Sequence, residues 1–345
     1  MSEPFTNRKV HAGPLHSDRR TAVVLLNMGG PDSLEAVEPF LYNLFSDRRL
    51  IALPGGPFLQ KPFARMISRR RARSARENYR HIGGRSPLLD WTERQALGLS
   101  RVLDSTWGIY VIMRYWQPRA QEVLWRMRND QVEQALVLPL YPQYAEATTG
   151  SSIADFRQAA ATLFPELTYA VIDHWYDWAP YLDALAARVV EGLESFPRDM
   201  RDEVPLLFSA HSLPQRVIDR GDPFLGQTLA TVRGVMQRIG DRPWHVGFQS
   251  RSGPVKWLRP SVDEVIKTLA AKGHKSLLMV PLSFVSDHIE TLHEIDVIYR
   301  RAATERGIVH FVRSPSLNDH PDFLQALAML LQRRYNDLCE PDDTA

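Results

Sequence analysis

The sequence contains a single cysteine, Cys339, in 345 residues. One thiol cannot form a disulfide within the chain, and it cannot supply the several thiolates that a structural zinc site or an iron–sulfur cluster requires. We therefore expect a protein of a reducing compartment, the cytoplasm, that carries no iron–sulfur cluster.

An excess of charge of one sign and long apolar runs are also missing. Lysine and arginine number 42 against 40 acidic residues, and this balance argues against nucleic acid as a partner. No stretch approaches the roughly 18 consecutive apolar residues of a membrane span. Residues 1–20 lack the apolar run of a secretory signal and are interpreted as a loose leader. Any contact with a membrane is expected at its surface.

The length of the chain indicates two domains, because a single hydrophobic core usually stops growing below this size. Short apolar runs alternate with helical patterns and predict parallel α/β units. Their nearly continuous apolar character is typical of sheets that helices cover on both faces. The six runs are residues 22–26, 109–114, 135–140, 204–208, 244–248 and 276–282.

The second half of the chain repeats features of the first. Residues 138–140 (LPL) and 280–282 (VPL) each end a predicted strand and precede a polar turn that opens a helix. Residues 112–115 and 247–251 each lead through a proline into another helix. The repeat predicts an α/β fold of two similar doubly wound parallel-sheet domains, Rossmann-like, with a cleft between them.

We place the first domain at residues 1–150, with an apolar lip at about 50–75, and the second at 151–319. The C-terminal helix, residues 320–345, is expected to pack back on the first domain. Ligands of open parallel sheets bind outside the carboxyl ends of the strands, so the cleft should lie between the two sets of strand ends. The loops expected to line it are 27–34, 141–151, 209–214 and 283–294.

A glycine turn, residues 27–32 (NMGGPD), follows the first predicted strand. It has neither the spacing of a dinucleotide-binding turn nor the Lys-Ser/Thr of a P-loop, which disfavours a nucleotide site. The turn is interpreted as a tight strand-to-helix connection in which Asp32 caps the helix, and it can also line the cleft.

His211 lies directly after a predicted strand, in the segment SAHSLP at 209–214. A neutral imidazole can accept a proton or bind a metal ion. A lone histidine at such a place is more often a hydrogen-bonded packing residue, so the segment alone leaves both interpretations open.

Glu290 and Glu294 are spaced one helical turn apart in the segment SDHIETLHE, residues 286–294, where the last long strand ends. Two interpretations stand here. The acidic residues can belong to a helix cap in which Ser286 or Asp287 is the N-cap. They can also form a carboxylate series for metal or protons, and only this account gives His288 a function.

Residues 50–75 join apolar side chains to a block of arginines that includes Arg70 and Arg71. Apolar side chains beside a cationic face suit an amphipathic segment at an anionic membrane surface. A solvated helix face beside a core stripe explains the same pattern equally well.

Taken together, these segments closely resemble the ferrochelatase family. The resemblance spans about residues 22–320 in the family's order, and its most specific parts are SAHSLP and SDHIETL. The other matching stretches are residues 25–53, 77–87 (ENYRHIGGRSP), 141–152 (YPQYAEATTGSS), 208–224, 248–260 and 280–296.

The resemblance implies an enzyme that inserts Fe(II), as a substrate, into protoporphyrin IX, with no tightly bound cofactor. The family's essential histidine and glutamate correspond to His211 and Glu290, expected on opposite faces of the macrocycle, and Glu294 joins them as a metal ligand. One turn further on stands Ile298, where some members continue the acidic series. The porphyrin-binding positions correspond to Met28, Tyr79, Arg114, Tyr115, Ser209, Trp257 and His288, with Arg70 and Arg71 on the lip.

His211 is expected to accept the pyrrole protons and to act as a transient iron ligand, while Glu290, Glu294 and His288 handle metal or export protons. Arg114 and the lip arginines are suited to pair with propionates. Further expected partners are a membrane surface, peripherally through residues 50–71, and a porphyrin-supplying enzyme. Three alternatives stand: coproporphyrin III as the substrate, a chelatase for another tetrapyrrole, and a haem or metal carrier without catalysis.

Overall fold

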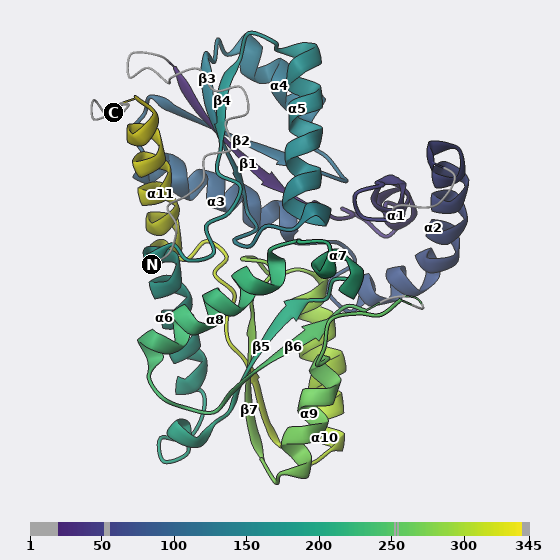
Figure 1. Ribbon diagram of the computed structural model, residues 1–345, viewed down its shortest axis with the longest axis vertical. Coiled ribbons are helices and arrows are strands. Elements are labelled where there is room, and N and C mark those ends of the chain that lie inside the picture. Colours follow the sequence, from purple (N-terminus) through teal and green to yellow (C-terminus); the bar gives the residue numbers. More distant parts are fainter. Residues whose placement is uncertain (1–19, 52–55, 252, 254, 340–345) are drawn as a thin grey trace.

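The computed structural model describes residues 20–51, 56–251, 253 and 255–339 (Figure 1). Residues 1–19 of the expected leader, part of the lip (52–55) and the last six residues of the expected C-terminal helix lie outside these ranges. Two four-stranded parallel sheets form the framework, in the orders β2-β1-β3-β4 and β6-β5-β7-β8. The identical strand order confirms the predicted pair of similar α/β units.

The strands of the first sheet are β1 (Thr21–Asn27), β2 (Trp107–Met113), β3 (Gln134–Pro139) and β4 (Thr168–Val171). Those of the second are β5 (Leu206–His211), β6 (Trp244–Gln249), β7 (Ser276–Pro281) and β8 (His310–Arg313). All six predicted runs are strands. β4 and β8 were not predicted, because each is four residues long and too short to show a pattern.

The helices of the first unit are α1 (Val37–Ser46), α2 (Gly56–Arg80), α3 (Leu88–Val102), α4 (Ala120–Asn129), the π-helix η1 (Glu146–Gly150) and α5 (Ser151–Leu163). The second unit contains α6 (Ala179–Glu194), the 3₁₀-helix η2 (Arg201–Glu203), α7 (Gln215–Asp219), α8 (Phe224–Ile239), α9 (Val262–Ala271), the π-helix η3 (Glu290–Tyr299) and α10 (Arg300–Glu305). The last helix is α11 (Pro321–Cys339).

The strands are continuously apolar because successive side chains enter different cores. In β1, Val23 and Leu25 belong to one buried cluster, while Val24 and Leu26 belong to another that α4 and α5 cover. The first of these clusters continues into the second sheet through residues such as Phe208. The two units therefore share one core on their inner faces and have separate cores on their outer faces.

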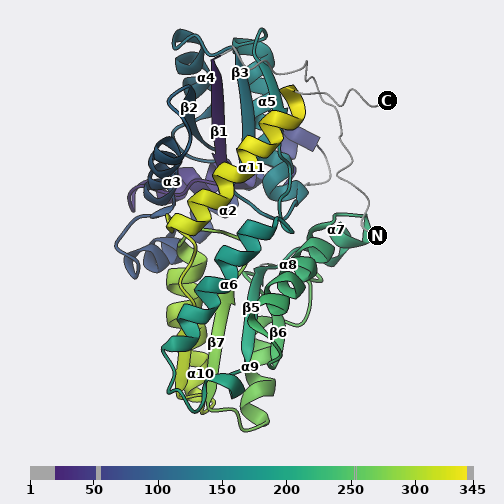
Figure 2. The same cartoon turned by 90° about the vertical axis from the view of Figure 1, so that its left-hand side faces the viewer.

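The expected domain boundary at residue 150 is wrong. β4 pairs with β3 in the first sheet, so this unit continues at least to Val171. The boundary was placed too early because the short β4 was not recognised. The C-terminal helix α11 packs on α3 of the first unit, as predicted, but equally on α6 of the second (Figure 2). Trp178 Nε1 secures that second contact by donating to the Ala326 carbonyl, 2.9 Å away.

The glycine turn after β1 depends on close backbone approach. Gly29 has φ +80°, and a Cβ on Gly30 would lie 2.4 Å from the Cβ of Ser86. Asp32 is not the cap of α1, because this helix begins at Val37 and Ser33 accepts the hydrogen bond from the Ala36 amide. The turn thus sets Met28 beside the end of the strand.

Candidate active site

His211 is the last residue of β5, in the second sheet. Its amide donates a 2.7 Å hydrogen bond to Ser283 Oγ, from the loop that follows β7. β5 and β7 are neighbours, so their carboxyl ends lie side by side. The strand register therefore brings His211 to the segment that carries the glutamates.

Glu290 is the first residue of the π-helix η3, and its carboxylate meets the His211 ring directly. The Nδ1 of His211 lies 3.0 Å from Glu290 Oε1, and Gln249 Nε2 donates to Oε2 over 3.0 Å. Both side chains therefore stand on one wall of the site. The expectation that they act from opposite faces of a macrocycle is wrong, because a ring cannot lie between two groups in hydrogen-bond contact.

Each member of the pair favours the ionised form of the other. Burial lowers the pKa of the His211 ring, but the Glu290 carboxylate outweighs this effect and leaves the pKa raised. Burial likewise raises the pKa of Glu290, but the charge and hydrogen bond of His211 hold it well below its usual range. The site thus favours an imidazolium–carboxylate pair, between whose members a proton can be exchanged.

Two further predicted residues surround Glu290. The Nδ1 of His288 lies 3.0 Å from the Ser286 carbonyl, and its Nε2 faces Glu290 Oε2 at 3.8 Å. Glu294 accepts a 2.7 Å hydrogen bond from Ser250 Oγ. Burial and the neighbouring charge of Glu290 raise the pKa of Glu294 to about 7. Glu294 therefore titrates near neutrality, in reach of the hydrogen-bonded pair.

The helix-capping account of this segment is wrong. The residue before η3 is Ile289, and no side chain caps the helix. Asp287 instead pairs with Arg313, and Ser286 Oγ accepts from Gln95. Glu290 and Glu294 are therefore free of a capping function, and their side chains belong to the site.

A cavity of about 470 Å³ opens beside Glu294. Trp257, Tyr299 and Asp263 are among its lining residues. Ser209, by contrast, is buried behind Gln249 and donates its hydroxyl hydrogen to Oε1 of that amide. Since Oε1 is thereby occupied, the amide NH₂ group faces Glu290, and Ser209 supports the site from behind.

Residues of the first unit approach η3 through an apolar cluster. Met28, Tyr79 and Tyr115 pack in the same cluster as Ile289, the residue before Glu290. Burial raises the pKa of Tyr79 strongly, and the charge of Glu290 adds to this effect. The fold thus brings Tyr79 close to Glu290 and places Met28 in the same apolar cluster, although both lie far from Glu290 in sequence.

Arg114 is engaged within the protein. Its guanidinium bonds Asp47 at 3.0 Å, Asp155 at 3.3 Å and Ser151 Oγ at 2.7 Å. Tyr115 is buried, and its hydroxyl donates to the same Asp47 oxygen. The structure therefore does not present Arg114 as a cation awaiting a propionate, because two carboxylates already neutralise it.

The described part of the lip lies on α2, which projects from the side of the first unit with α1 (Figure 1). Phe58 is 89% exposed, and Arg70 and Arg71 are exposed on the same helix. The guanidinium of Arg71 lies over the ring of Phe45, 5.7 Å from its centroid. A second cavity of about 630 Å³ is lined by Tyr42, Lys61, Pro62, Arg65, Met66 and Arg69.

The sequence analysis missed Gln249 and Ser250, which bind Glu290 and Glu294. Neither residue type signals chemistry by itself. The available signal was their position, because both follow the core of a predicted strand adjacent to that of His211. A search restricted to strand ends would have found them.

Within the described ranges, no three or more His, Cys, Asp or Glu side chains are arranged to hold a metal ion. Among the same residues, no helix has the length and apolar composition to cross a membrane. His211, Glu290 and Glu294 therefore do not form a preformed cage, and their metal-binding function stays a prediction.

Solved structures that share this fold include a sirohydrochlorin chelatase. The sirohydrochlorin chelatase SirB from Bacillus subtilis subspecies spizizenii, solved in complex with cobalt, has a TM-score of 0.50 with 10% identity, over 94% of this chain and 97% of that one. The structure titled "SirB from Bacillus subtilis with Fe3+" has a TM-score of 0.51 with 11% identity, over 92% and 96%. At this identity, the likeness establishes the fold alone.

The sequence comparisons are more specific. The family profile named Ferrochelatase matches residues 20–335. The ferrochelatase of Geotalea uraniireducens (strain Rf4) is 51% identical over 91% of this chain and 98% of its own length. That of Synechocystis sp. (strain ATCC 27184 / PCC 6803 / Kazusa) is 43% identical over 92% and 83%. The chain belongs to the ferrochelatase family and is thus a porphyrin metal chelatase of haem biosynthesis.

Proposed function

We propose that this chain inserts Fe(II) into protoporphyrin IX to form protohaem, with release of two protons, as the last step of haem biosynthesis. The enzyme class is that of the lyases. The observation that carries the proposal is the hydrogen-bonded His211–Glu290 pair next to the apolar cluster that contains Met28 and Tyr79. Iron enters as a substrate, and the proposal includes no tightly bound cofactor and no iron–sulfur cluster.

The geometry suits His211 for taking protons from the pyrrole nitrogens. Glu290 holds Nδ1, which leaves Nε2 as the basic nitrogen once the ring is neutral. The carboxylate then stabilises the imidazolium that forms, as an acidic partner does for other catalytic histidines. Each accepted proton can pass by way of Glu290 to Glu294, whose pKa of about 7 suits a group that takes and releases protons near neutrality.

Metal handling is assigned to the same side chains. A borderline imidazole and hard carboxylates suit Fe(II), and a site of few ligands lets the ion leave for the porphyrin. His211 and Glu290 act as transient ligands with Glu294 behind them, and His288 keeps the carboxylate of Glu290 in place. The same donor set should accept Zn(II) and Co(II).

The porphyrin is assigned to the space between the two units. Met28, Tyr79 and Trp257 contact its faces, while Tyr115 and Ser209 act from behind as supporting residues. Arg70 and Arg71 on α2 are the proposed partners of the propionates, because guanidinium matches carboxylate geometry. Arg114 contributes by bracing the wall rather than by binding a propionate.

The apolar surroundings favour protoporphyrin IX over coproporphyrin III. Coproporphyrin carries propionates where protoporphyrin carries vinyl groups, and burying extra carboxylates beside Met28 and Tyr79 would be unfavourable without partner cations. Coproporphyrin III is the alternative substrate. The rates of iron insertion when both porphyrins compete for the enzyme distinguish the two substrates.

We further propose that α2 touches the inner face of a membrane from the cytoplasm. Phe58, Leu59 and Met66 are exposed on this helix, and it has no acidic residue in its first turn. Apolar side chains beside arginines favour anionic lipid headgroups. The same face suits transfer of an apolar ring from a porphyrin-supplying enzyme.

The deciding experiment is anaerobic metallation of both porphyrins with Fe(II), followed by absorbance, for the wild type and His211→Ala. We expect insertion by the wild type and a loss of about 10²- to 10⁴-fold in kcat in the variant, with porphyrin binding retained. Binding without insertion by the wild type would indicate a carrier. Insertion only into another tetrapyrrole would indicate a different chelatase.

A further inference from the structure

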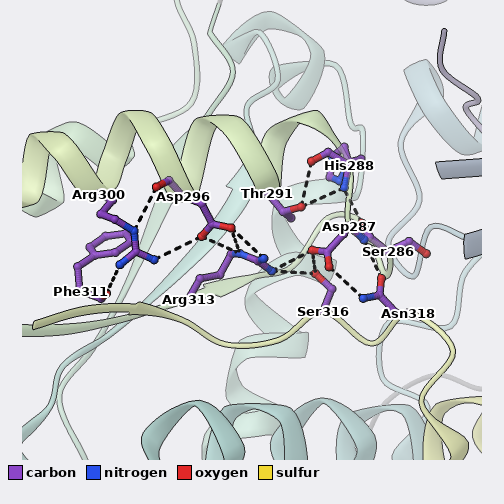
Figure 3. A network of polar contacts seen from close by, with 10 residues as sticks. All are labelled: Ser286, Asp287, His288, Thr291, Asp296, Arg300, Phe311, Arg313, Ser316 and Asn318. Atoms are coloured by element: carbon purple, nitrogen blue, oxygen red, sulfur yellow. Dashed lines mark hydrogen bonds and ion pairs between the residues drawn. The ribbon is translucent and has the colours of Figure 1, made fainter. Parts of the chain in front are cut away.

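Arg313, the last residue of β8, binds two carboxylates on either side of the active-site segment (Figure 3). Its Nη1 donates to Asp287 Oδ1 over 2.9 Å. Its Nε and Nη2 each donate to Asp296, at 3.0 Å. A planar guanidinium has fixed donor directions, so the two carboxylates are held at a set separation.

The two carboxylates bracket the chemistry in sequence. Asp287 stands before the π-helix η3, and Asp296 lies within it. His288, Glu290 and Glu294 all fall between them. A shift of either carboxylate would therefore move the backbone that carries the candidate catalytic side chains.

Further hydrogen bonds hold Asp287 in place. Its carboxylate accepts from Ser316 Oγ at 2.7 Å and from Asn318 Nδ2 at 3.0 Å, and its amide donates to Asn318 Oδ1. Gln95, on α3 of the first unit, donates to both Ser286 Oγ and the Asn318 carbonyl. The network thus fixes the start of the active-site segment against both units.

The π-helix makes such bracing necessary. A helix with i→i+5 bonds is less favourable than an α-helix and occurs mostly in short stretches at functional sites. In η3 this geometry spans ten residues. Glu290 must stay within 3.0 Å of His211, a residue of another element, so the helix has to keep its register relative to β5.

We propose that Arg313 is a positioning residue for the Glu290–His211 pair, acting through Asp287 and Asp296 at the two ends of the active-site segment. This inference rests on the proposed function for its effect on turnover. In this proposal Arg313 itself touches neither the porphyrin nor the iron. Its loss should therefore lower kcat and leave the KM for porphyrin unchanged.

The test replaces Arg313 by Lys, which keeps the charge but cannot bind both carboxylates, and by Ala. We expect kcat to fall about 10- to 100-fold in Arg313→Lys, with the porphyrin KM within about twofold of the wild type. If Arg313→Ala does not fold, Arg313→Lys and Asp296→Asn still test the positioning function, because both weaken the link between Arg313 and η3 and should lower kcat.

The matched control is Arg238, an arginine of the same unit that joins α8 to α6. It pairs with Asp183 and donates to the carbonyls of Gly234 and Ala179. Arg238→Lys should lose less stability in urea than Arg313→Lys, because Asp183 is exposed, and it should leave kcat unchanged. Equal kcat values for the two lysine variants, or losses that simply follow the unfolded fraction, would overturn the inference.

A second readout does not depend on turnover. The ¹H–¹⁵N spectrum of the histidine rings reports the bond between His211 Nδ1 and Glu290. Arg313→Lys should shift the His211 signals, whereas Arg238→Lys should not, and unchanged signals in both would refute the positioning function. The two proposals can also fail separately. If the wild type is inactive but Arg313→Lys still shifts the His211 signals, the proposed function is refuted and the positioning function of Arg313 is supported.

Discussion

The strand-end sites of the two units have the same backbone plan, but their carboxylates are neutralised in different ways. In the first unit the Met113 amide bonds the Pro118 carbonyl, and in the second the Phe248 amide bonds the Pro260 carbonyl. Arg114 in the first unit is therefore equivalent to Gln249 in the second.

The register of β1 and β5 extends the correspondence. Leu26 pairs with Pro139 in the first sheet, and Ser209 pairs with Pro281 in the second. Leu26 and Ser209 are therefore equivalent positions. Two residues further along each strand, Met28 is equivalent to His211. Each unit also has a π-helix that begins with a glutamate, η1 with Glu146 and η3 with Glu290, although Glu290 lies two residues further from its strand than Glu146 does. The two sites thus differ in side chains, while their frameworks coincide.

The difference lies in what neutralises the carboxylates. In the first unit Arg114, a permanent cation, binds Asp47 and Asp155, and no proton can be exchanged there. In the second unit the equivalent Gln249 is neutral, so the partner of Glu290 is the titratable His211. The comparison shows how one framework yields a bracing site in one copy and a proton-exchanging site in the other.

Converting the second site into the first should have the largest effect. Gln249→Arg would place a permanent cation against Glu290, and we expect kcat for iron insertion to fall about 10³-fold. Gln249→Met, which removes the amide without adding charge, is the control. An equal loss in both variants would show that the hydrogen bond matters and the charge does not.

The reverse change should act on stability. Arg114→Gln leaves the buried Asp47 without its cation, while the half-buried Asp155 keeps only Arg119 at 3.7 Å, so the free energy of unfolding should fall by about 3 kcal/mol, measured in urea. The control is Arg128→Gln, which breaks an exposed ion pair with Glu166 and should cost less than about 1 kcal/mol. Similar losses in the two variants would contradict the bracing function.

The pKa of Glu294 predicts a smaller, pH-dependent effect. The folded-state pKa of about 7 lies above the ordinary value of 4.5, so the folded protein binds this proton more tightly than the unfolded chain. Relative to Glu294→Gln, the wild type should lose on the order of 2 kcal/mol of stability as the pH rises from 5 to 8. A stability difference that is constant with pH, in urea titrations, would rule this out.

The smallest effect is expected at the glutamate that begins η1. Glu146 pairs with Arg49, and the two side chains are 43% and 47% exposed. Glu146→Gln should change the free energy of unfolding by less than about 1 kcal/mol. The same substitution at Glu290 should remove most of the turnover, and equal effects at both positions would break the comparison.

Much of the framework could be predicted from local patterns. Strands such as β1 and β7 are continuous apolar runs, and the repeated proline-ended strand revealed the duplication. The four-residue strands β4 and β8 could not be predicted, because four residues hold too little periodicity. Missing β4 displaced the domain boundary.

The motifs named candidate residues for the site but not how they are arranged. Motifs pointed to His211 and Glu290, yet placed them on opposite faces, and Arg114 was assigned to a propionate although two carboxylates occupy it. Gln249 and Arg313 were missed because amides and arginines are common and only their partners show their function.

The sequence by itself determined the α/β class, the duplication, the family and the pair of residues on which the chemistry is proposed to depend. These properties depend on residues that are close together in the sequence, in apolar runs and short motifs. Only the tertiary structure decided that His211 meets Glu290, 79 positions away, and that Gln95 reaches Ser286 across 191. Such contacts depend on how strand ends meet in space, which no local pattern encodes.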